Sequence, residues 1–299
     1  MASVLPPDAR DSTCADHLLA DSRLPRGEAR LLLERASGRR REWLLAHGDS
    51  PLGEAVCGRF LSLTARREKG EPIAYLLGER EFHGRALAVD ARVLIPRPET
   101  ELLVDEAVVR APEGACVIDL GTGSGAIAIS LALARPDLNI VASDASGDAL
   151  ALAQHNADRL GVPRTQLHFR QGDWWQVAAT GEQFALAIAN PPYIAESDPH
   201  LLEGDLRFEP KVALASGADG LDALSSIIAG APPRLEPDGW ILLEHGWDQA
   251  ARVRQLLGDC GLTTVSSLRD LAGHERVSLA RASSRARRAP LPRTAGRVV

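Results

Sequence analysis

The sequence lacks the features that mark secreted, membrane-spanning and zinc-binding proteins. No apolar run approaches the roughly 18 residues that a membrane helix needs, so we predict no membrane span. The first residues are polar and mixed in charge, unlike a secretory signal. The four cysteines are scattered and form no Cys-x-x-Cys pair, which argues against zinc sites and disulfide frameworks. We therefore expect a cytoplasmic protein with free thiols and no metal site.

A surplus of positive charge is also missing from most of the chain. The formal net charge is −6, and residues 281–299 contain six arginines and no acid, so residues 1–280 carry −6 − 6 = −12. Proteins that hold nucleic acid by its phosphates need lysine and arginine in place of counterions. We therefore expect no direct nucleic-acid partner. The arginine-rich tail over 282–299 has few large apolar residues, and we predict that it is disordered.

The apolar residues that are present follow two different periods. Over residues 16–70 they recur every three or four positions among arginine and glutamate, which predicts a small bundle of helices. We expect breaks between these helices at Gly27, Gly38, Gly48 and Pro51.

From residue 98 onward, short apolar runs alternate with helical patterns. The apolar runs predict strands at 116–120, 140–143, 167–170, 184–189 and 240–243. The helical patterns lie at 127–134, 149–160 and 221–235. Strands that alternate with helices form βαβ units, so the fold class is α/β with a doubly wound parallel sheet. The last two apolar runs are close enough in sequence to pair antiparallel, at 263–268 and 276–280.

A change of pattern between these two parts suggests a linker. Residues 81–90 read as a β-hairpin. We therefore divide the chain into a helical domain, a hairpin linker, an α/β domain and a tail, with bounds 1–78, 79–96, 97–281 and 282–299.

A glycine-rich loop follows the first predicted strand of the α/β domain. Its residues are Gly121, Thr122, Gly123, Ser124 and Gly125. Glycine allows a sharp turn and a close approach to a ligand, and the next helix offers free N–H groups. Asp144 ends the following strand, where an acid can bind the hydroxyls of a ribose. The spacing also satisfies a looser dinucleotide fingerprint, so the loop alone leaves a nicotinamide cofactor open.

Three further residues are candidates for cofactor contact. Asp173 and Trp174 close the third strand, and a carboxylate with an indole suits an adenine. Trp174 is favoured over Trp175 because it follows Asp173 directly. Asp119 either contacts the amino group of a methionine moiety or caps the turn, and the sequence favours neither.

The tetrad Asn190-Pro191-Pro192-Tyr193 is the most informative motif. It follows the fourth predicted strand, at the edge where open α/β sheets bind ligands. Two prolines cannot continue a central strand, and they direct the Pro191 carbonyl outward. With the side-chain oxygen of Asn190 it offers two acceptors for a substrate –NH₂ group, while Tyr193 stacks on the plane that bears it. Such a site can hold an amide or an adenine amine, and it requires no metal.

The glycine loop, the tetrad and two further segments resemble one family. The segments are Gly-Glu-Pro-Ile-Ala-Tyr-Leu-Leu-Gly at 70–78 and Leu-Ile-Pro-Arg-Pro-Glu-Thr-Glu at 94–101. Over residues 15–281 the chain is similar to the bacterial peptide chain release factor N(5)-glutamine methyltransferases, the HemK/PrmC family. The resemblance implies a helical N-terminal domain, a hairpin and a seven-stranded class I methyltransferase domain. It also implies S-adenosyl-L-methionine as cofactor and the glutamine of the Gly-Gly-Gln loop of class I release factors as substrate.

On this interpretation the enzyme is a monomer whose helical domain recognises the protein substrate. The family's cofactor role falls on residues 121–125, Asp144 and Trp174, and its substrate role on residues 190–193. An N6-adenine methyltransferase acting on DNA or RNA is the alternative, since the tetrad can also hold an adenine amine. The acidic body argues against it. A module that only binds the cofactor is a third hypothesis. The roles of Arg97, Glu99 and Glu244 are open between site and scaffold.

Overall fold

The computed structural model describes residues 14–284, so the predicted tail lies outside the described residues from position 285 onward. The chain divides into two compact units. Among the described residues, the helical unit comprises 14–80, 88–95 and 199–210, and the sheet unit comprises 81–87, 96–198 and 211–284.

The helical unit contains five helices around one apolar core. They are α1 (Ala15–Asp21), α2 (Arg26–Ser37), α3 (Arg41–Ala46), α4 (Glu54–Glu68) and α5 (Ile73–Leu77). Leu32, Leu33 and Phe60 are fully buried at the centre of this core, which confirms the predicted bundle. The predicted break at Gly27 is wrong. Gly27 lies in the first turn of α2, where backbone amides have no intrahelical partner and glycine is tolerated.

The helical unit also includes residues that lie late in the sequence. Residues 199–210 join it through two 3₁₀ turns, η4 (Pro199–Leu202) and η5 (Leu206–Phe208). Arg67 contacts Glu28 at 2.7 Å and Asp205 at 3.3 Å. Glu209 is buried and accepts a hydrogen bond from the Ile95 amide at 3.0 Å. The predicted domain bounds therefore remain a proposal. They assign residues 199–210 to the α/β domain, whereas in the structure these residues pack with the helical unit.

The predicted hairpin is present. Strands β1 (Glu79–Phe82) and β2 (Arg85–Ala88) form a two-stranded sheet. The two residues between them, His83 and Gly84, both have positive φ, at 48° and 71°. Two-residue hairpin loops need such backbone angles to match the twist of the strands.

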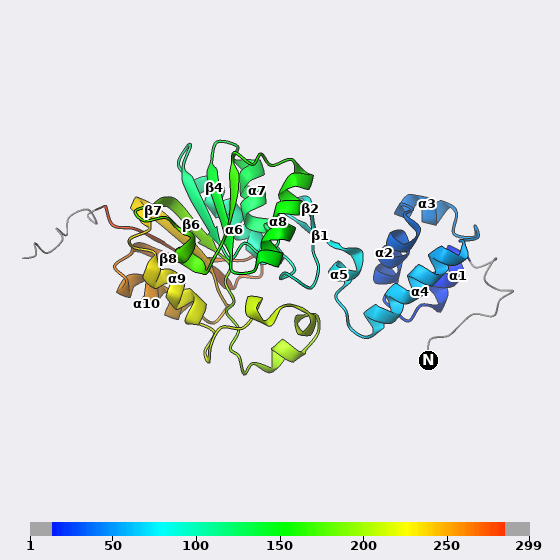
Figure 1. The fold of residues 1–299 in the computed structure, drawn as a ribbon. Coiled ribbons are helices and arrows are strands. Elements are labelled where there is room, and N and C mark those ends of the chain that lie inside the picture. The colour runs from blue at the N-terminus through cyan, green and yellow to red at the C-terminus, as the bar shows by residue number, and fades with distance from the viewer. Residues whose placement is uncertain (1–13, 285–299) are drawn as a thin grey trace, which may run out of the picture. The chain divides into compact units, whose positions relative to one another are not determined.

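The seven remaining strands form one sheet in the order β5-β4-β3-β6-β7-β9-β8. Four of them, β4, β6, β7 and β8, are labelled in Figure 1. The first five are parallel, and β9 runs antiparallel to both β7 and β8, so the doubly wound sheet and the antiparallel end are confirmed. The strands are β3 (Cys116–Leu120), β4 (Asn139–Asp144), β5 (Leu167–Gln171), β6 (Phe184–Ala189), β7 (Leu235–Glu244), β8 (Thr263–Arg269) and β9 (Glu275–Arg281).

Helices cover both faces of this sheet because successive strand residues point to opposite faces. Val117 and Ile140 pack in one apolar cluster, and their chain neighbours Ile118 and Val141 pack in another. The first cluster includes residues of α6 (Glu101–Arg110), α7 (Ala126–Ala134) and α8 (Gly147–Leu160). The second includes residues of α9 (Asp222–Gly230) and α10 (Ala250–Asp259).

One predicted helix of the sheet unit is shorter than expected. The pattern over 221–235 predicted a continuous helix, but α9 ends at Gly230 and β7 begins at Leu235. Pro232 and Pro233 lie between them, and proline cannot continue a helix because it lacks the N–H group and its ring clashes with the preceding turn.

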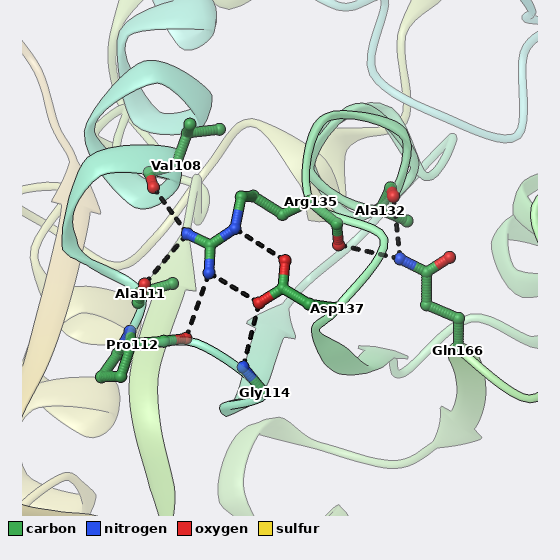
Figure 2. Close-up of polar contacts among 8 residues, drawn as sticks. All are labelled: Val108, Ala111, Pro112, Gly114, Ala132, Arg135, Asp137 and Gln166. Atoms are coloured by element: carbon green, nitrogen blue, oxygen red, sulfur yellow. Dashed lines mark hydrogen bonds and ion pairs between the residues drawn. The ribbon is translucent and has the colours of Figure 1, made fainter.

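At the amino ends of the parallel strands, one arginine joins several chain segments (Figure 2). The Arg135 guanidinium donates to the carbonyls of Val108, Ala111 and Pro112 and forms two hydrogen bonds with Asp137, at 2.8 and 2.7 Å. Asp137 also accepts from a backbone amide in the loop before β3. The guanidinium therefore connects α6 and the loop after it to the end of α7. Its hydrogen bonds and charge also hold the pKa of Asp137 below the usual value.

Candidate active site

The register of the parallel strands brings four of the predicted residues into one row at the carboxyl edge of the sheet. Leu120 of β3 pairs with Ser143 of β4 and Ala189 of β6, and Ala189 pairs with Leu243 of β7. The residues that follow these four positions are therefore neighbours across the sheet, in the order Asp144, Gly121, Asn190 and Glu244. The strand order reverses between β3 and β6, so the row crosses the topological switch point where such sheets bind ligands.

The glycine loop lies at the centre of this row. Gly121, Gly123 and Gly125 have φ values of 78°, 55° and 84°, a region that side chains with a Cβ rarely adopt. A Cβ on Gly121 would lie 3.2 Å from the ring of Trp174, whereas the position beside Gly123 is open. The Gly123 amide donates to Asp144 Oδ2 at 2.9 Å, so the loop is attached to the acid predicted to bind ribose.

Two buried polar side chains, Asp119 and Asn156, form hydrogen bonds with this loop. Thr122 donates its hydroxyl to Asp119 Oδ2 at 2.6 Å, and the Asn156 side-chain amide donates to the Ser124 carbonyl at 2.9 Å. Burial raises the pKa of Asp119 to about 7, against the hydrogen bonds of Thr122 and Ala128, which lower it. These contacts show that Asp119 orders the turn. Sequence analysis missed Asn156, because a helical asparagine carries no signal for a contact 32 residues away in the chain.

The two tryptophans after β5 have different environments. Trp175 is buried, and its indole N–H donates to the Ile227 carbonyl at 2.8 Å, so its ring belongs to the core. Trp174 is only partly buried and lies against Gly121, with a left-handed backbone angle of 41°. Asp173 is exposed beside it. The structure therefore brings Trp174, and not Trp175, to the glycine loop.

These residues fit S-adenosylmethionine. The loop has open space beside Gly123, and the N-terminus of α7 follows directly at Ala126. The Asp144 carboxylate is partly exposed next to the loop, where it can accept from ribose hydroxyls, and the Trp174 indole is placed to cover an adenine.

Asn190 of the tetrad has one satisfied and one unsatisfied end. Its Nδ2 donates to the hydroxyl of Thr100 at 3.0 Å. Its Oδ1 is buried and has no hydrogen-bond partner within residues 14–284. A buried acceptor without a donor costs about 1–3 kcal/mol, so this oxygen at the ligand-binding edge can accept from a bound ligand. Sequence analysis missed Thr100, although it lies in the family segment at 94–101.

Tyr193 of the tetrad is held at its hydroxyl by a residue of β7 and at its backbone by the residue before α10. The hydroxyl donates to Glu244 Oε1 at 3.2 Å, and the Tyr193 carbonyl accepts from Gln249 Nε2 at 3.0 Å. Burial and then the Glu244 carboxylate raise the pKa of the Tyr193 hydroxyl, so it stays protonated. Pro191 is buried and Pro192 half-buried between the two functional side chains.

Glu244 is fully buried at the end of this row, with 1% of its surface exposed. Burial raises its pKa to about 7, while the hydrogen bond from Tyr193 and the charge of Arg276 lower it. The charge of Glu99 raises it further. The second carboxyl oxygen of Glu244, Oε2, is buried and accepts from no described residue. Glu244 therefore contacts the tetrad instead of lying apart from it.

Glu99 itself is exposed in a 3₁₀ turn, η2 (Pro98–Thr100), that leads into α6. Pro98 occupies the first position of that turn, where its missing N–H has no consequence. Pro98 and Glu99 therefore serve to begin the helix that follows, which is one of the two roles that the sequence left open. Arg97 precedes the turn and is half-buried, and its charge lowers the pKa of Tyr193.

A doubly wound sheet with a glycine loop and an Asn-Pro-Pro-Tyr tetrad at its switch point defines a class I S-adenosylmethionine-dependent methyltransferase. Two family models agree: the PrmC N-terminal domain matches residues 13–78, and the methyltransferase small domain matches residues 98–203. A methyltransferase of known structure from Pyrococcus furiosus shares the fold, with a TM-score of 0.52, 15% identity and coverage of 74% of this chain and 98% of its own.

Curated relatives specify the family within this class. The release factor glutamine methyltransferase of Bordetella pertussis is 51% identical over 89% of this chain and 98% of its own. The enzyme of the same name from Escherichia coli K12 is 46% identical over 88% of this chain and 94% of its own. The chain belongs to the release factor glutamine methyltransferase family. Within the described residues, no helix has the length and apolar character to cross a membrane.

Proposed function

We propose that this enzyme transfers the methyl group of S-adenosylmethionine to the side-chain amide nitrogen of the glutamine in the Gly-Gly-Gln motif of class I peptide chain release factors. The observation that carries the proposal is the buried Oδ1 of Asn190 at the switch point of the sheet, an acceptor to which no residue of 14–284 donates. A primary amide supplies the donor that this oxygen lacks.

In this proposal residues 121–125, Asp144, Asp173 and Trp174 hold the cofactor, which supplies an electrophilic methyl group when it is bound. Residues 190–193 hold the substrate. The Asn190 Oδ1 and the Pro191 carbonyl accept the two N–H hydrogens of the glutamine amide, and the Tyr193 ring packs on the amide plane. Two acceptors draw electron density toward the nitrogen and aim it, which favours attack by an otherwise weak nucleophile. One N–H remains in the product, and the other proton is released to water.

We further propose that the enzyme is a monomer in the cytoplasm that needs no direct contact with nucleic acid, and that the helical unit provides a second contact with the release factor. A single amide gives little affinity, so a protein substrate needs a larger surface. The helical unit exposes large apolar side chains at Leu31, Leu45 and Leu61. Substitution of Leu45 by serine should raise KM for the release factor and leave cofactor affinity unchanged.

The direct test is to incubate the enzyme with methyl-labelled S-adenosylmethionine and a purified release factor, and to map the label by mass spectrometry. We expect one methyl group on the Gly-Gly-Gln glutamine and none on a release factor whose glutamine is replaced by alanine. Duplex DNA and RNA serve as competing substrates. Label on adenine, with none on the release factor, would support the adenine methyltransferase instead.

A further inference from the structure

Two neighbouring turns at the carboxyl edge of the sheet carry exposed apolar side chains. The first turn, 246–249, lies between β7 and α10, and its Trp247 is 63% exposed. The second turn, 270–274, joins β8 to β9, and its Leu271 is fully exposed. Because β9 runs antiparallel to β7, its first residues lie beside the end of β7, and the ring centroids of Trp247 and His274 are 6.0 Å apart. We call Trp247, Leu271 and His274 the Trp247 patch.

Hydrogen bonds hold the backbone of both turns. In the second turn the Gly273 amide donates to the Asp270 carbonyl, and the His274 amide donates to the Asp270 carboxylate, each at 2.9 Å. In the first turn the Gly246 amide donates to the side-chain oxygen of Gln249 at 2.8 Å, and the Gln249 amide donates back to the Gly246 carbonyl at 3.0 Å. The patch is therefore carried on an ordered backbone, which lowers the entropy cost of binding a partner.

The turn that carries Trp247 also holds the tetrad. Glu244, which precedes the turn, accepts from the Tyr193 hydroxyl at 3.2 Å, and Gln249 donates to the Tyr193 carbonyl at 3.0 Å. Trp247 lies between these two residues in the chain. It is two residues before Gln249, so their Cα atoms are at most about 8 Å apart. The Trp247 patch is therefore continuous with the surface around Tyr193.

A protein substrate covers more of this surface than the tetrad alone. A stable protein interface buries about 800 Å² on each partner, which corresponds to a circle with a radius of about 16 Å. A release factor whose glutamine lies in the tetrad therefore reaches the turn that holds Tyr193. Tryptophan is enriched among the residues that contribute most to protein binding, and neighbouring exposed apolar side chains mark such surfaces.

We propose that the Trp247 patch is a docking surface for the release factor, and that it binds an apolar segment of that protein beside the Gly-Gly-Gln loop. The patch adds affinity for the whole protein, whereas the tetrad selects the glutamine. The charged side chains Asp270 and Arg276 beside the patch pair with each other at 3.0 Å, so the patch offers apolar contact and not a binding site for phosphates. This inference rests on the proposed function.

The first experiment measures kcat and KM for the release factor at saturating S-adenosylmethionine. We expect Trp247→Ala to raise KM by about 10- to 100-fold and Leu271→Ser by about 3- to 10-fold, with kcat close to wild type, because the patch binds the protein without touching the amide. Trp247→Phe keeps an aromatic ring and should recover most of the affinity. The side chain of Leu271 is fully exposed, so its replacement should not lower the midpoint of thermal unfolding.

Val109→Ser is the matched control. Val109 is an apolar side chain with 79% of its surface exposed, and it lies in the last turn of α6, next to the residues that Arg135 holds at the amino edge. This variant should keep the wild-type KM. A wild-type KM in both Trp247→Ala and Leu271→Ser would overturn the proposal. A fall in kcat at an unchanged KM in Trp247→Ala would also overturn it, because Trp247 would then act by holding Tyr193.

A second measurement needs no turnover. With the release factor immobilised, surface plasmon resonance should show that Trp247→Ala dissociates about tenfold faster or more and associates at nearly the wild-type rate, since loss of an apolar contact acts mainly on dissociation. If binding depends on Trp247 in this way while the methyl label maps elsewhere than on glutamine, the proposed function fails and the docking surface stands. If glutamine is labelled but binding is the same in wild type, Trp247→Ala and Leu271→Ser, the docking surface fails and the proposed function stands. Loss of binding to duplex DNA or RNA in these variants, with none to the release factor, would overturn the docking proposal.

Discussion

The two edges of the sheet differ in how fully their polar groups are hydrogen-bonded. At the amino edge, Arg135 donates to three backbone carbonyls and pairs with Asp137, whose pKa is lowered by that pairing (Figure 2). At the carboxyl edge, no described residue donates to the buried Oδ1 of Asn190, and burial raises the pKa values of Asp119 and Glu244 to about 7.

The difference separates what holds the fold together from what performs the reaction. Satisfied hydrogen bonds and paired charges stabilise the amino edge, whereas buried carboxyls and an unsatisfied amide destabilise the carboxyl edge. Under the proposed function, a substrate amide supplies the donor that no described residue provides. We therefore expect substitutions at the carboxyl edge to lower activity and substitutions at the amino edge to lower stability.

The largest effect should come from Asn190→Ala. It removes the proposed acceptor for the substrate, so we expect kcat to fall by about 100- to 1000-fold, the loss typical of one electrostatic contact in a transition state. Cofactor affinity, measured by calorimetry, should change little. The midpoint of thermal unfolding should also change little, because removal of the unsatisfied oxygen offsets loss of the hydrogen bond to Thr100. A tenfold loss of cofactor affinity would place Asn190 in cofactor binding instead.

The second effect is a dependence of stability on pH. The pKa of Glu244 is about 7 in the folded protein, above its usual value of 4.5, so the folded state binds the proton more tightly than the unfolded state. The resulting stability is fully present below about pH 4.5 and is lost as pH rises through 7. Between pH 5 and pH 8 the free energy of unfolding should fall by about 3 kcal/mol from this group.

Urea unfolding of wild type and Glu244→Gln at pH 5 and pH 8 tests this. The glutamine variant should lose this part of the pH dependence and be more stable than wild type at pH 8. Equal pH dependence of the two proteins would show that Glu244 is not the group responsible. Asp119, whose raised pKa has the same sign, adds a similar dependence that remains in the variant.

The third effect should have the opposite character. Arg135→Ala leaves the carbonyls of Val108 and Ala111 without their donor, so we expect a loss of about 1–3 kcal/mol of stability. The value of kcat at 25 °C should stay close to wild type. Arg164→Ala is the control, since Arg164 forms a largely exposed pair with Asp158 and such pairs contribute little. A large loss of kcat in Arg135→Ala would contradict the division between the edges.

The smallest effect separates the two tryptophans within the carboxyl edge. Trp174→Ala removes a ring that lies against the glycine loop, and we expect cofactor affinity to fall about tenfold, the value of one stacking contact. Trp175→Ala removes a core ring and its hydrogen bond to Ile227, so it should lower stability first. Calorimetric titration of each folded variant with the cofactor measures the affinity. A tenfold loss of cofactor affinity in Trp175→Ala, with none in Trp174→Ala, would assign the cofactor contact to Trp175 instead.

Much of the site could be predicted because its positions follow from rules that act along the chain. The ends of parallel strands meet at one edge, so residues 121–125, Asp144 and Asn190 could be placed together from sequence alone, and the register confirms this row. The choice of Trp174 over Trp175 for adenine contact stays a prediction. The contacts of Thr100 and Asn156 could not be predicted, since each depends on a partner far away in the chain.

The sequence by itself determined the α/β class, the hairpin, the glycine loop and the Asn-Pro-Pro-Tyr tetrad, because periodicity and the backbone limits of glycine and proline are local properties. Only the tertiary structure decided which polar groups are satisfied. The attachment of residues 199–210 to the helical unit, the bond from Asn190 to Thr100 and the burial of Glu244 all arise from packing between distant segments. Packing removes water from these groups, and that removal sets their pKa values and leaves one amide oxygen without a donor among the described residues.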